Sequence, residues 1–234
     1  MFPIITQILK PIALIGLIGL AACQSAGGVT VGNADPQMAE YEVTLRSTWT
    51  QSNHPFEYPE AGVLTGPHFS GLIGATHDGQ YEIFAEGKTP TPGLERLSEE
   101  GKHDPLNREI QAAIAAGNVG ALFETDPLRD FSQGVSARFR IDERHPQVSA
   151  VAMIAPSPDW FAGVRNLNLM ENGQWVRSRT VTLYGYDSGG DTGATYKAPD
   201  MDANPKQATR LAKDPHFVKN GQLIPVGTLT FTKL

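Results

Sequence analysis

Three aspartates that follow predicted strands are the residues of this chain with the clearest potential for chemistry. Asp159 comes after the apolar run at residues 151–155, while Asp187 and Asp191 flank two glycines after the alternating stretch 180–186. A hard cation such as Ca²⁺ takes about six to eight oxygen ligands and tolerates irregular geometry, so carboxylates on glycine-containing loops suit it. We therefore expect these carboxylates to hold a calcium ion at one end of a sheet.

The same acids also allow a plainer interpretation and an enzymatic one. Asp and Gly are common in turns, so residues 187–191 are equally typical of a solvated turn. A pair of carboxylates serves glycoside hydrolases, but carboxylates that coordinate Ca²⁺ are poorly placed to exchange protons. The chain has neither a Gly-x-Ser-x-Gly nor a His-Glu-x-x-His motif, which mark common hydrolases. We expect no catalytic activity, with a cell-envelope hydrolase as the alternative.

Three histidines invite an interpretation as zinc ligands. His54, His68 and His77 lie in a stretch that we expect to be rich in loops, and neutral imidazole is a common zinc ligand. Their spacings of fourteen and nine residues match no short zinc motif. We therefore favour the alternative that these side chains cap loops through hydrogen bonds.

Large aromatic residues beside the acids could form a platform for a ligand. Trp160 and Phe161 directly follow Asp159 in the chain. Because large aromatic side chains dominate the cores of β proteins, we expect both of them to pack in the core instead, together with Trp49 and Trp175.

The only cysteine of the chain, Cys23, marks the end of a predicted secretion signal. It directly follows the apolar segment 12–22, which Lys10 precedes. Residues 20–23, Leu-Ala-Ala-Cys, resemble a bacterial lipobox, in which the cysteine is acylated and the chain is cut before it. About eleven apolar residues are too few to span a membrane, which takes about 20. Gln24 after the cysteine is typical of lipoproteins of the Gram-negative outer membrane.

Composition and length indicate one domain behind this signal. We expect residues 1–22 to be the signal peptide, 23–39 a flexible tether and 40–234 one domain, since splitting the chain would leave two small pieces. Hydrophobic residues make up 40% and charged residues 19%, which are globular values, and 24 glycines and 17 prolines indicate many turns. The net charge of -6 disfavours binding to nucleic acid, which needs clustered Lys and Arg.

Residue patterns predict an all-β fold, an antiparallel β-sandwich with short helical insertions. Strands are predicted where apolar residues alternate or run on between turn residues, at residues 41–50, 81–85, 135–142, 151–155, 166–170, 174–176, 180–186 and 228–232. Helical spacing predicts two helices, over 94–100 and 105–116, packed over a sheet edge. Asn172-Gly173 favours a tight hairpin turn. The polar stretch 199–227 is expected to be a long loop.

Several of these motifs, taken in order, resemble the spondin domain. The resemblance rests on residues 153–161 (MIAPSPDWF), 172–175 (NGQW) and 183–193 (LYGYDSGGDTG). Earlier motifs fit the same pattern: Thr48-Trp49, His54-Pro55, Tyr58-Pro59 and the run 68–77. The resemblance covers residues 40–195 and fades beyond Pro199.

The resemblance implies a C2-like antiparallel sandwich of about eight strands that carries Ca²⁺ and has an adhesive or recognition role. The calcium ligands of the family fall on Asp159, Asp187 and Asp191 of this chain. One departure is Arg140, which stands where a further acidic ligand is expected, with Asp142 two residues on and on the same face. Arg140 could pair with Asp159 or Asp191 and weaken the site.

These features together predict a non-catalytic adhesion or recognition module that binds calcium on the bacterial cell envelope. A lipid on Cys23 would attach it to the membrane, most naturally the outer membrane. The expected partner is an extracellular protein or glycan, and no nucleic acid. A structural envelope protein without a soluble ligand is a further alternative to the hydrolase.

Overall fold

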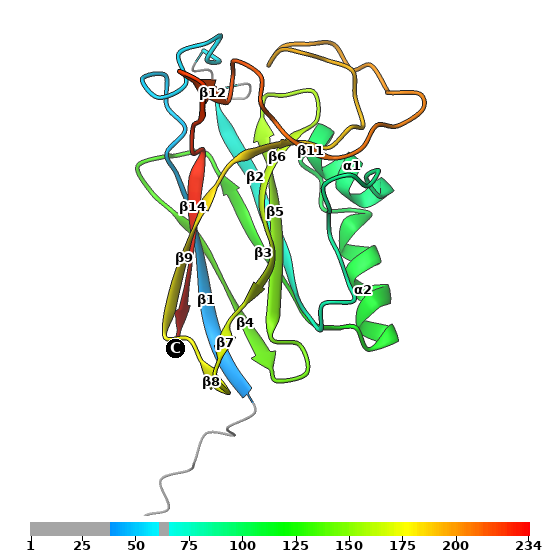
Figure 1. Ribbon diagram of the computed structural model, residues 1–234, viewed down its shortest axis with the longest axis vertical. Helices are drawn as coiled ribbons and strands as arrows, with labels where there is room; N and C mark the ends of the chain where they lie inside the picture. Colours follow the sequence, from blue (N-terminus) through cyan, green and yellow to red (C-terminus); the bar gives the residue numbers. More distant parts are fainter. Residues whose placement is uncertain (1–37, 61–65) are drawn as a thin grey trace, which may run out of the picture. The chain divides into compact units, whose positions relative to one another are not determined.

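Two antiparallel β-sheets form the protein in a computed structural model, which describes residues 38–60 and 66–234 (Figure 1). The predicted signal peptide, Cys23 and the tether up to residue 37 lie outside the described residues. One sheet has the strand order β4–β1–β14–β9, and the other has the order β11–β10–β6–β5–β2–β3. The predicted antiparallel all-β sandwich is confirmed.

The strands differ widely in length. The four-stranded sheet consists of β1 (Met38–Ser47), β4 (Val135–Asp142), β9 (Ser178–Leu183) and β14 (Gly227–Lys233). The six-stranded sheet consists of β2 (His68–His77), β3 (Val119–Leu128), β5 (Gln147–Ala155), β6 (Trp160–Asn168), β10 (Gly185–Asp187) and β11 (Arg210–Leu211). Two small hairpins complete the fold, β7 (Met170–Glu171) with β8 (Gln174–Trp175) and β12 (Val218–Lys219) with β13 (Gln222–Leu223).

The main core lies between the two sheets. On β1, the buried side chains of Tyr41, Val43 and Leu45 alternate with outward-facing ones, which is the pattern of a strand that is covered on one face. Phe139 of β4 stacks on Phe123 of the opposite sheet, with 4.5 Å between the ring centroids. The predicted boundaries of the strand at residues 135–142 are confirmed, because this alternation is strict there.

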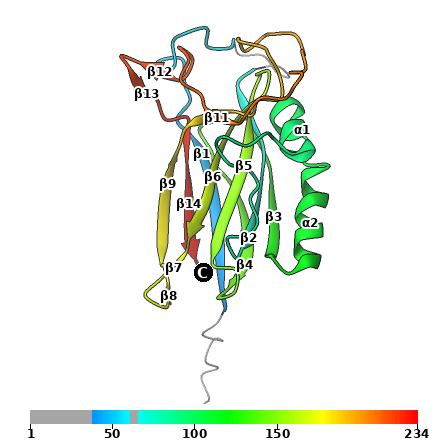
Figure 2. The same cartoon turned by 45° about the vertical axis from the view of Figure 1, so that its right-hand side comes forward.

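A second core lies on the outer face of the six-stranded sheet, where the two helices α1 (Pro92–Glu100) and α2 (Leu106–Ala116) cover it (Figure 2). Leu94, Leu97 and Ile110 pack against Ile73 and Val151. The middle strands β2 and β5 are therefore buried on both faces, which explains their continuous apolar sequence. Neither helix of the described part of the chain is long and apolar enough to cross a membrane.

Both helices begin and end at signals that can be read in the sequence. The side chain of Thr91 caps α1 by accepting a hydrogen bond from the backbone nitrogen of Leu94 at 3.1 Å. Gly101 and Gly117 end the helices with positive φ angles of 67° and 86°, a conformation that glycine adopts at little cost. The two predicted helices are confirmed, but they cover the outer face of the six-stranded sheet and not its edge, where they were expected.

Two strands of the six-stranded sheet differ from the prediction. Residues 68–77 were expected to be rich in loops, but they form the buried central strand β2. The glycines of this strand fit because side chains of neighbouring strands fill the space beside their backbone. At Gly74, for example, an added Cβ would lie 2.3 Å from the ring of Phe123. Strand β3, at residues 119–128, was not predicted, since Asp126 and Pro127 interrupt its pattern.

Three other strand predictions are wrong in whole or in part. Residues 81–85 form no strand; their apolar side chains are buried in the second core without pairing to a sheet. The predicted strand at 166–170 is mostly the end of β6, which begins at Trp160. The stretch 180–186 is two strands, since the chain leaves the four-stranded sheet after β9 and enters the other sheet at β10.

The turn and loop predictions agree better with the structure. Asn172 and Gly173 connect β7 to β8 with positive φ angles of 52° and 73°, as a primed hairpin turn requires. The closing strand predicted at 228–232 is confirmed as β14. The stretch 199–227 is mainly loop, but it also contains β11 and the hairpin β12–β13.

Candidate functional site

The structure brings the three predicted aspartates together at one end of the six-stranded sheet. Asp159 immediately precedes β6, and Asp187 ends the neighbouring strand β10, where it pairs with Trp160 in the register of the two strands. Asp191 follows in the same loop. All three are buried, with exposed fractions of 0%, 7% and 6% in that order.

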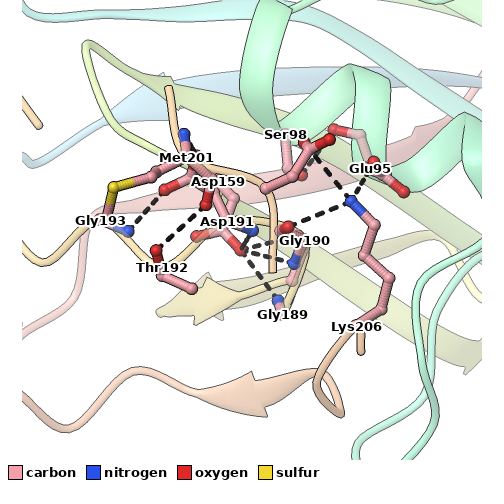
Figure 3. Close-up of polar contacts among 12 residues, drawn as sticks. Glu95, Ser98, Asp159, Gly189, Gly190, Asp191, Thr192, Gly193, Met201 and Lys206 are labelled. Atoms are coloured by element: carbon pink, nitrogen blue, oxygen red, sulfur yellow. Dashed lines mark hydrogen bonds and ion pairs between the residues drawn. The ribbon is translucent and has the colours of Figure 1, made fainter. Parts of the chain in front are cut away.

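Asp159 is held by the loop that carries the other two acids (Figure 3). Its Oδ2 accepts hydrogen bonds from the Ser188 hydroxyl at 3.0 Å and from the backbone amides of Gly189, Gly190 and Asp191 at 2.9, 2.9 and 3.2 Å. Successive amides of this kind form a concave nest for an anion. Its Oδ1, by contrast, is buried without any hydrogen-bond partner. Burial raises the pKa of Asp159, although the amide bonds oppose that rise.

Asp187 faces both this nest and a positive charge. Its Oδ1 accepts a hydrogen bond from the amide of Gly189 at 2.9 Å, and its Oδ2 forms an ion pair with Arg210. Burial and the nearby carboxylate of Asp159 raise the pKa of Asp187 to about 6, while Arg210 opposes this rise. The two buried acids therefore repel one another, and one arginine offsets part of that repulsion.

Asp191 connects the acidic loop to the long C-terminal loop. Its Oδ1 accepts a hydrogen bond from the amide of Gly193 and its Oδ2 one from the amide of Met201 (Figure 3). The backbone of Ala203 also donates to the carbonyl of Gly190, at 2.8 Å. The polar stretch after residue 193 is thereby folded back over the site.

A pocket of about 180 Å³ opens beside these acids. It is lined by Trp160, Asp187, Asp191, Thr192, Gly193, Ala194, Gln207, Arg210 and Asp214. Three of these residues were not predicted, because they come from a stretch whose sequence is typical only of a polar loop: Gln207, Arg210 and Asp214. The position of Arg210 could be inferred only from its pairing opposite Asp187 in β11 and β10.

The chemistry of these donors suits a calcium ion, but within residues 38–60 and 66–234 the carboxylate oxygens of the three aspartates do not all lie within 4.8 Å of one another. A buried carboxyl oxygen without a partner, Asp159 Oδ1, lies on the same loop cluster as two further carboxylates that line the pocket. Oxygen donors that include carboxylates are the ligands Ca²⁺ takes. The calcium ligands predicted from the sequence remain a prediction.

A second acidic cluster adjoins the first on the side of α1. Glu95, Glu99 and Asp202 offer carboxylate oxygens within 4.8 Å of one another. Lys206 lies among them: its Nζ pairs with Glu95, lies 3.6 Å from Asp202 Oδ1 and donates to the carbonyl of Gly190 at 3.2 Å. This ammonium group supplies the positive charge of the cluster (Figure 3). The signal missed in the sequence was the spacing of Glu95 and Glu99, which lie one helical turn apart.

Glu99 is the acid of this cluster whose pKa is raised. Burial, followed by repulsion from Glu95, raises its pKa to about 7, and its Oε1 is buried without a hydrogen-bond partner. A Cβ at Gly190 would lie only 2.6 Å from that oxygen. The second cluster therefore packs directly against the loop that carries Asp191.

Arg140 does not lie at this site, which corrects the concern raised by the sequence. It is exposed on β4, opposite Glu40 of β1. Strand β4 is followed at Asp142 by the turn into β5, whereas Asp159 follows the other end of β5. The arginine that pairs with a site carboxylate is Arg210.

The three histidines are separate. His68 Nδ1 lies 2.7 Å from the carbonyl of Gly66, and His77 Nε2 lies 2.8 Å from the Ser149 hydroxyl, so the predicted hydrogen bonding is confirmed for these two. His54 is fully buried, with neither ring nitrogen in a hydrogen bond, and burial lowers its pKa to about 4. No group of potential metal ligands among residues 38–60 and 66–234 includes a histidine.

The aromatic residues beside the acids belong to the core, as expected. Trp160 and Phe161 are buried, and the Trp160 ring lies 5.1 Å from Tyr196 and 5.0 Å from Phe217. Trp49 is also fully buried, and Trp175 packs against the same core at its edge. A ligand platform of these rings is therefore not formed, although Trp160 forms one wall of the pocket.

Comparison with known proteins agrees with the resemblance seen in the sequence. Residues 39–217 match the Spondin_N family, so the match continues beyond Pro199, where the resemblance was expected to fade. Spondin-2 of Rattus norvegicus is 32% identical over 232 residues, which cover 94% of this chain and 69% of the relative. Spondin-2 of Homo sapiens is 34% identical over 188 residues, covering 80% and 56%. Spondin-1 of Xenopus laevis is 25% identical over 207 residues, covering 84% of this chain but only 25% of the relative.

Proposed function

The chain belongs to the Spondin_N family, and from this premise we propose that it is a calcium-binding recognition or adhesion module without catalytic activity. The observation that carries the proposal is the buried, unpartnered Oδ1 of Asp159 beside the carboxylates of Asp187 and Asp191. A buried carboxyl oxygen without a partner is costly, and a cation would satisfy it.

The electrostatics of the site support a cation in the same way. Burial raises the pKa values of Asp159 and Asp187, so the protein disfavours their charged forms when no ion is bound. A divalent cation favours those charged forms and offsets the repulsion between them. In this proposal Ca²⁺ braces the loop that contains Asp191 against the end of the sandwich.

The absence of catalysis is supported by how the carboxylates are engaged. Asp159 Oδ2 and both oxygens of Asp191 accept hydrogen bonds from backbone amides. Because the loop backbone occupies these oxygens, they are poorly placed to transfer a proton to or from a substrate. The loops around the pocket would then present a surface for an extracellular protein or glycan.

The place of action in this proposal is the bacterial cell envelope. The lipobox-like residues 20–23 support acylation of Cys23 and attachment to a membrane, and Gln24 supports the outer membrane. Mass spectrometry of the protein purified from membranes tests this point. Cys23 should be the N-terminal residue and carry the mass of its acyl chains; an unmodified Cys23 would contradict the anchor.

Calcium binding is tested by thermal unfolding of the purified full-length protein in calcium and in chelator. At free calcium about 100-fold above its dissociation constant, binding adds about 2.7 kcal/mol of stability. For a domain of this size that corresponds to a rise in Tm of about 5–10 °C. Asp159→Asn should lose this rise, whereas the control Asp126→Asn, an exposed position on β3, should keep it. Identical wild-type melting curves in calcium and chelator would overturn the proposal.

A further inference from the structure

Arg210 already places a positive charge at the acidic site. It lies in β11 directly opposite Asp187 of β10, and its guanidinium pairs with Asp187 Oδ2. The Arg210 side chain is 57% exposed, whereas that of Asp187 is 11% exposed. A buried carboxylate is thus held by a cation that reaches it from the solvent side of the pocket.

The carboxylate oxygens of the three aspartates differ in whether they already have a hydrogen-bond donor, and an oxygen without one is the better ligand for Ca²⁺. Asp159 Oδ2, Asp187 Oδ1 and both oxygens of Asp191 accept hydrogen bonds from backbone amides. The two that accept none are Asp159 Oδ1, which has no partner, and Asp187 Oδ2, which Arg210 holds. Among the oxygens of these three aspartates, Asp187 Oδ2 is therefore the one that a second cation could take only by displacing Arg210.

We infer that Arg210 is a competing internal cation that sets the calcium affinity of the site: its guanidinium holds Asp187 Oδ2 until Ca²⁺ displaces it. The inference rests on the proposed calcium binding. It adds that binding is an exchange of one cation for another and that Arg210 opposes binding both by occupying a ligand and by like-charge repulsion.

The exchange requires only the side chain of Arg210 to move. Backbone contacts on both sides fix the strand: the amide of Thr209 donates to the carbonyl of Lys88 at 2.8 Å, and the amide of Ala212 donates to that of Gly185 at 2.9 Å. The Thr209 hydroxyl also donates to the carbonyl of Ser188 at 2.9 Å. Because these contacts do not involve the guanidinium, β11 stays in place when Arg210 swings into solvent.

Calcium titration by calorimetry, with the purified full-length protein, tests the inference. Arg210→Gln keeps a polar side chain but removes the charge, and it should lower the dissociation constant for Ca²⁺ about tenfold. Arg210→Lys, which keeps a charge, should bind closer to wild type. The matched control is Arg165→Gln: this arginine lies on β6 of the same sheet, is 41% exposed and pairs with Glu82 away from the acids. It should leave the dissociation constant unchanged.

The possible results distinguish the role of Arg210 from calcium binding itself. Tighter binding by Arg210→Gln, or binding by that variant alone, supports the competition. Equal dissociation constants for wild type and Arg210→Gln would overturn the role of Arg210 and leave calcium binding intact. No calcium binding by either protein would overturn both.

A spectroscopic measurement on the wild-type protein keeps the test independent of how the variant folds. The arginine side-chain Nε–Hε signals can be followed by NMR during calcium titration. The signal of Arg210 should shift as its ion pair with Asp187 breaks, while the signal of Arg165 should not. An Arg210 signal that stays unchanged at saturating calcium would show that the guanidinium is not displaced.

Discussion

Asp159 is a buried carboxylate whose two oxygens have opposite surroundings. Oδ2 accepts four hydrogen bonds from the loop at residues 188–191, whereas Oδ1 is sealed from solvent with none. A side chain needed only to shape that loop would be complete with Oδ2 alone. The unpartnered oxygen is the single-residue feature on which the proposed cation site rests.

Glu99 gives a second prediction at the scale of one residue: Glu99→Gln should stabilise the protein above about pH 7 and have little effect near pH 4. Burial and Glu95 raise the pKa of Glu99 to about 7. When folding raises the pKa of a carboxyl group, the folded state keeps a proton that the unfolded state has lost. The free energy of unfolding therefore falls as the pH rises from the unfolded pKa, about 4.3 for glutamate, to the folded pKa. Glutamine cannot ionise, so the variant avoids this loss.

The expected gain for Glu99→Gln is about 1 kcal/mol, less than the full pKa shift implies, because the side chain is partly exposed. Urea unfolding between about pH 4 and pH 8 measures it, with Glu143→Gln as an exposed control. A gain that is the same at every pH would contradict the assigned cause.

At the scale of the elements, the sequence predicted best where local signals and tertiary contacts agree. Residues 135–142 alternate strictly, and the helices carry capping residues, so these elements were found. The three aspartates could be grouped because each follows a strand. Arg210 could not be assigned to this site from the sequence. It lies in β11, which has only two residues and is held by backbone hydrogen bonds to distant segments. Strand β2 was missed because burial on both faces removes its alternation.

The acidic loop should depend on the small size of Gly189. Its φ is 85°, and an added Cβ would lie 2.4 Å from the backbone carbonyl oxygen of Gln207. Gly173, in the β7–β8 hairpin, also has a positive φ of 73°, but nothing lies within 4 Å of an added Cβ. Gly173→Ala should therefore cost only the backbone strain, about 1–2 kcal/mol. Gly189→Ala should cost at least about 1 kcal/mol more, because backbone must also shift.

Urea unfolding of the two glycine variants separates strain from crowding. If the variants lose equal stability, the close approach of residues 189 and 207 is not what holds the acidic loop. If Gly189→Ala alone also weakens calcium binding, the loop geometry and the cation site are one unit.

At the scale of the whole molecule, the acidic site and the start of the described chain lie at opposite ends of the sandwich (Figure 1). Met38 pairs with Asp142, next to the turn that leads into β5, while Asp159 follows the far end of β5. The loops that carry the three aspartates therefore lie at the end of the sandwich remote from the first described residue. This arrangement suits a module that presents its loops to a partner.

The site of recognition should therefore be the loop end of the sandwich, and it should depend on calcium. On a glycan array, binding by the full-length protein should fall at least about tenfold in chelator or with Asp187→Ala, because both release the loops that the cation braces. Arg144→Ala is the control: it changes an exposed side chain in the turn at the opposite end, between β4 and β5, and should bind as wild type does. Binding that survives Asp187→Ala but is lost in Arg144→Ala would place recognition at the end of the sandwich where the described chain begins, and calcium would have no part in it.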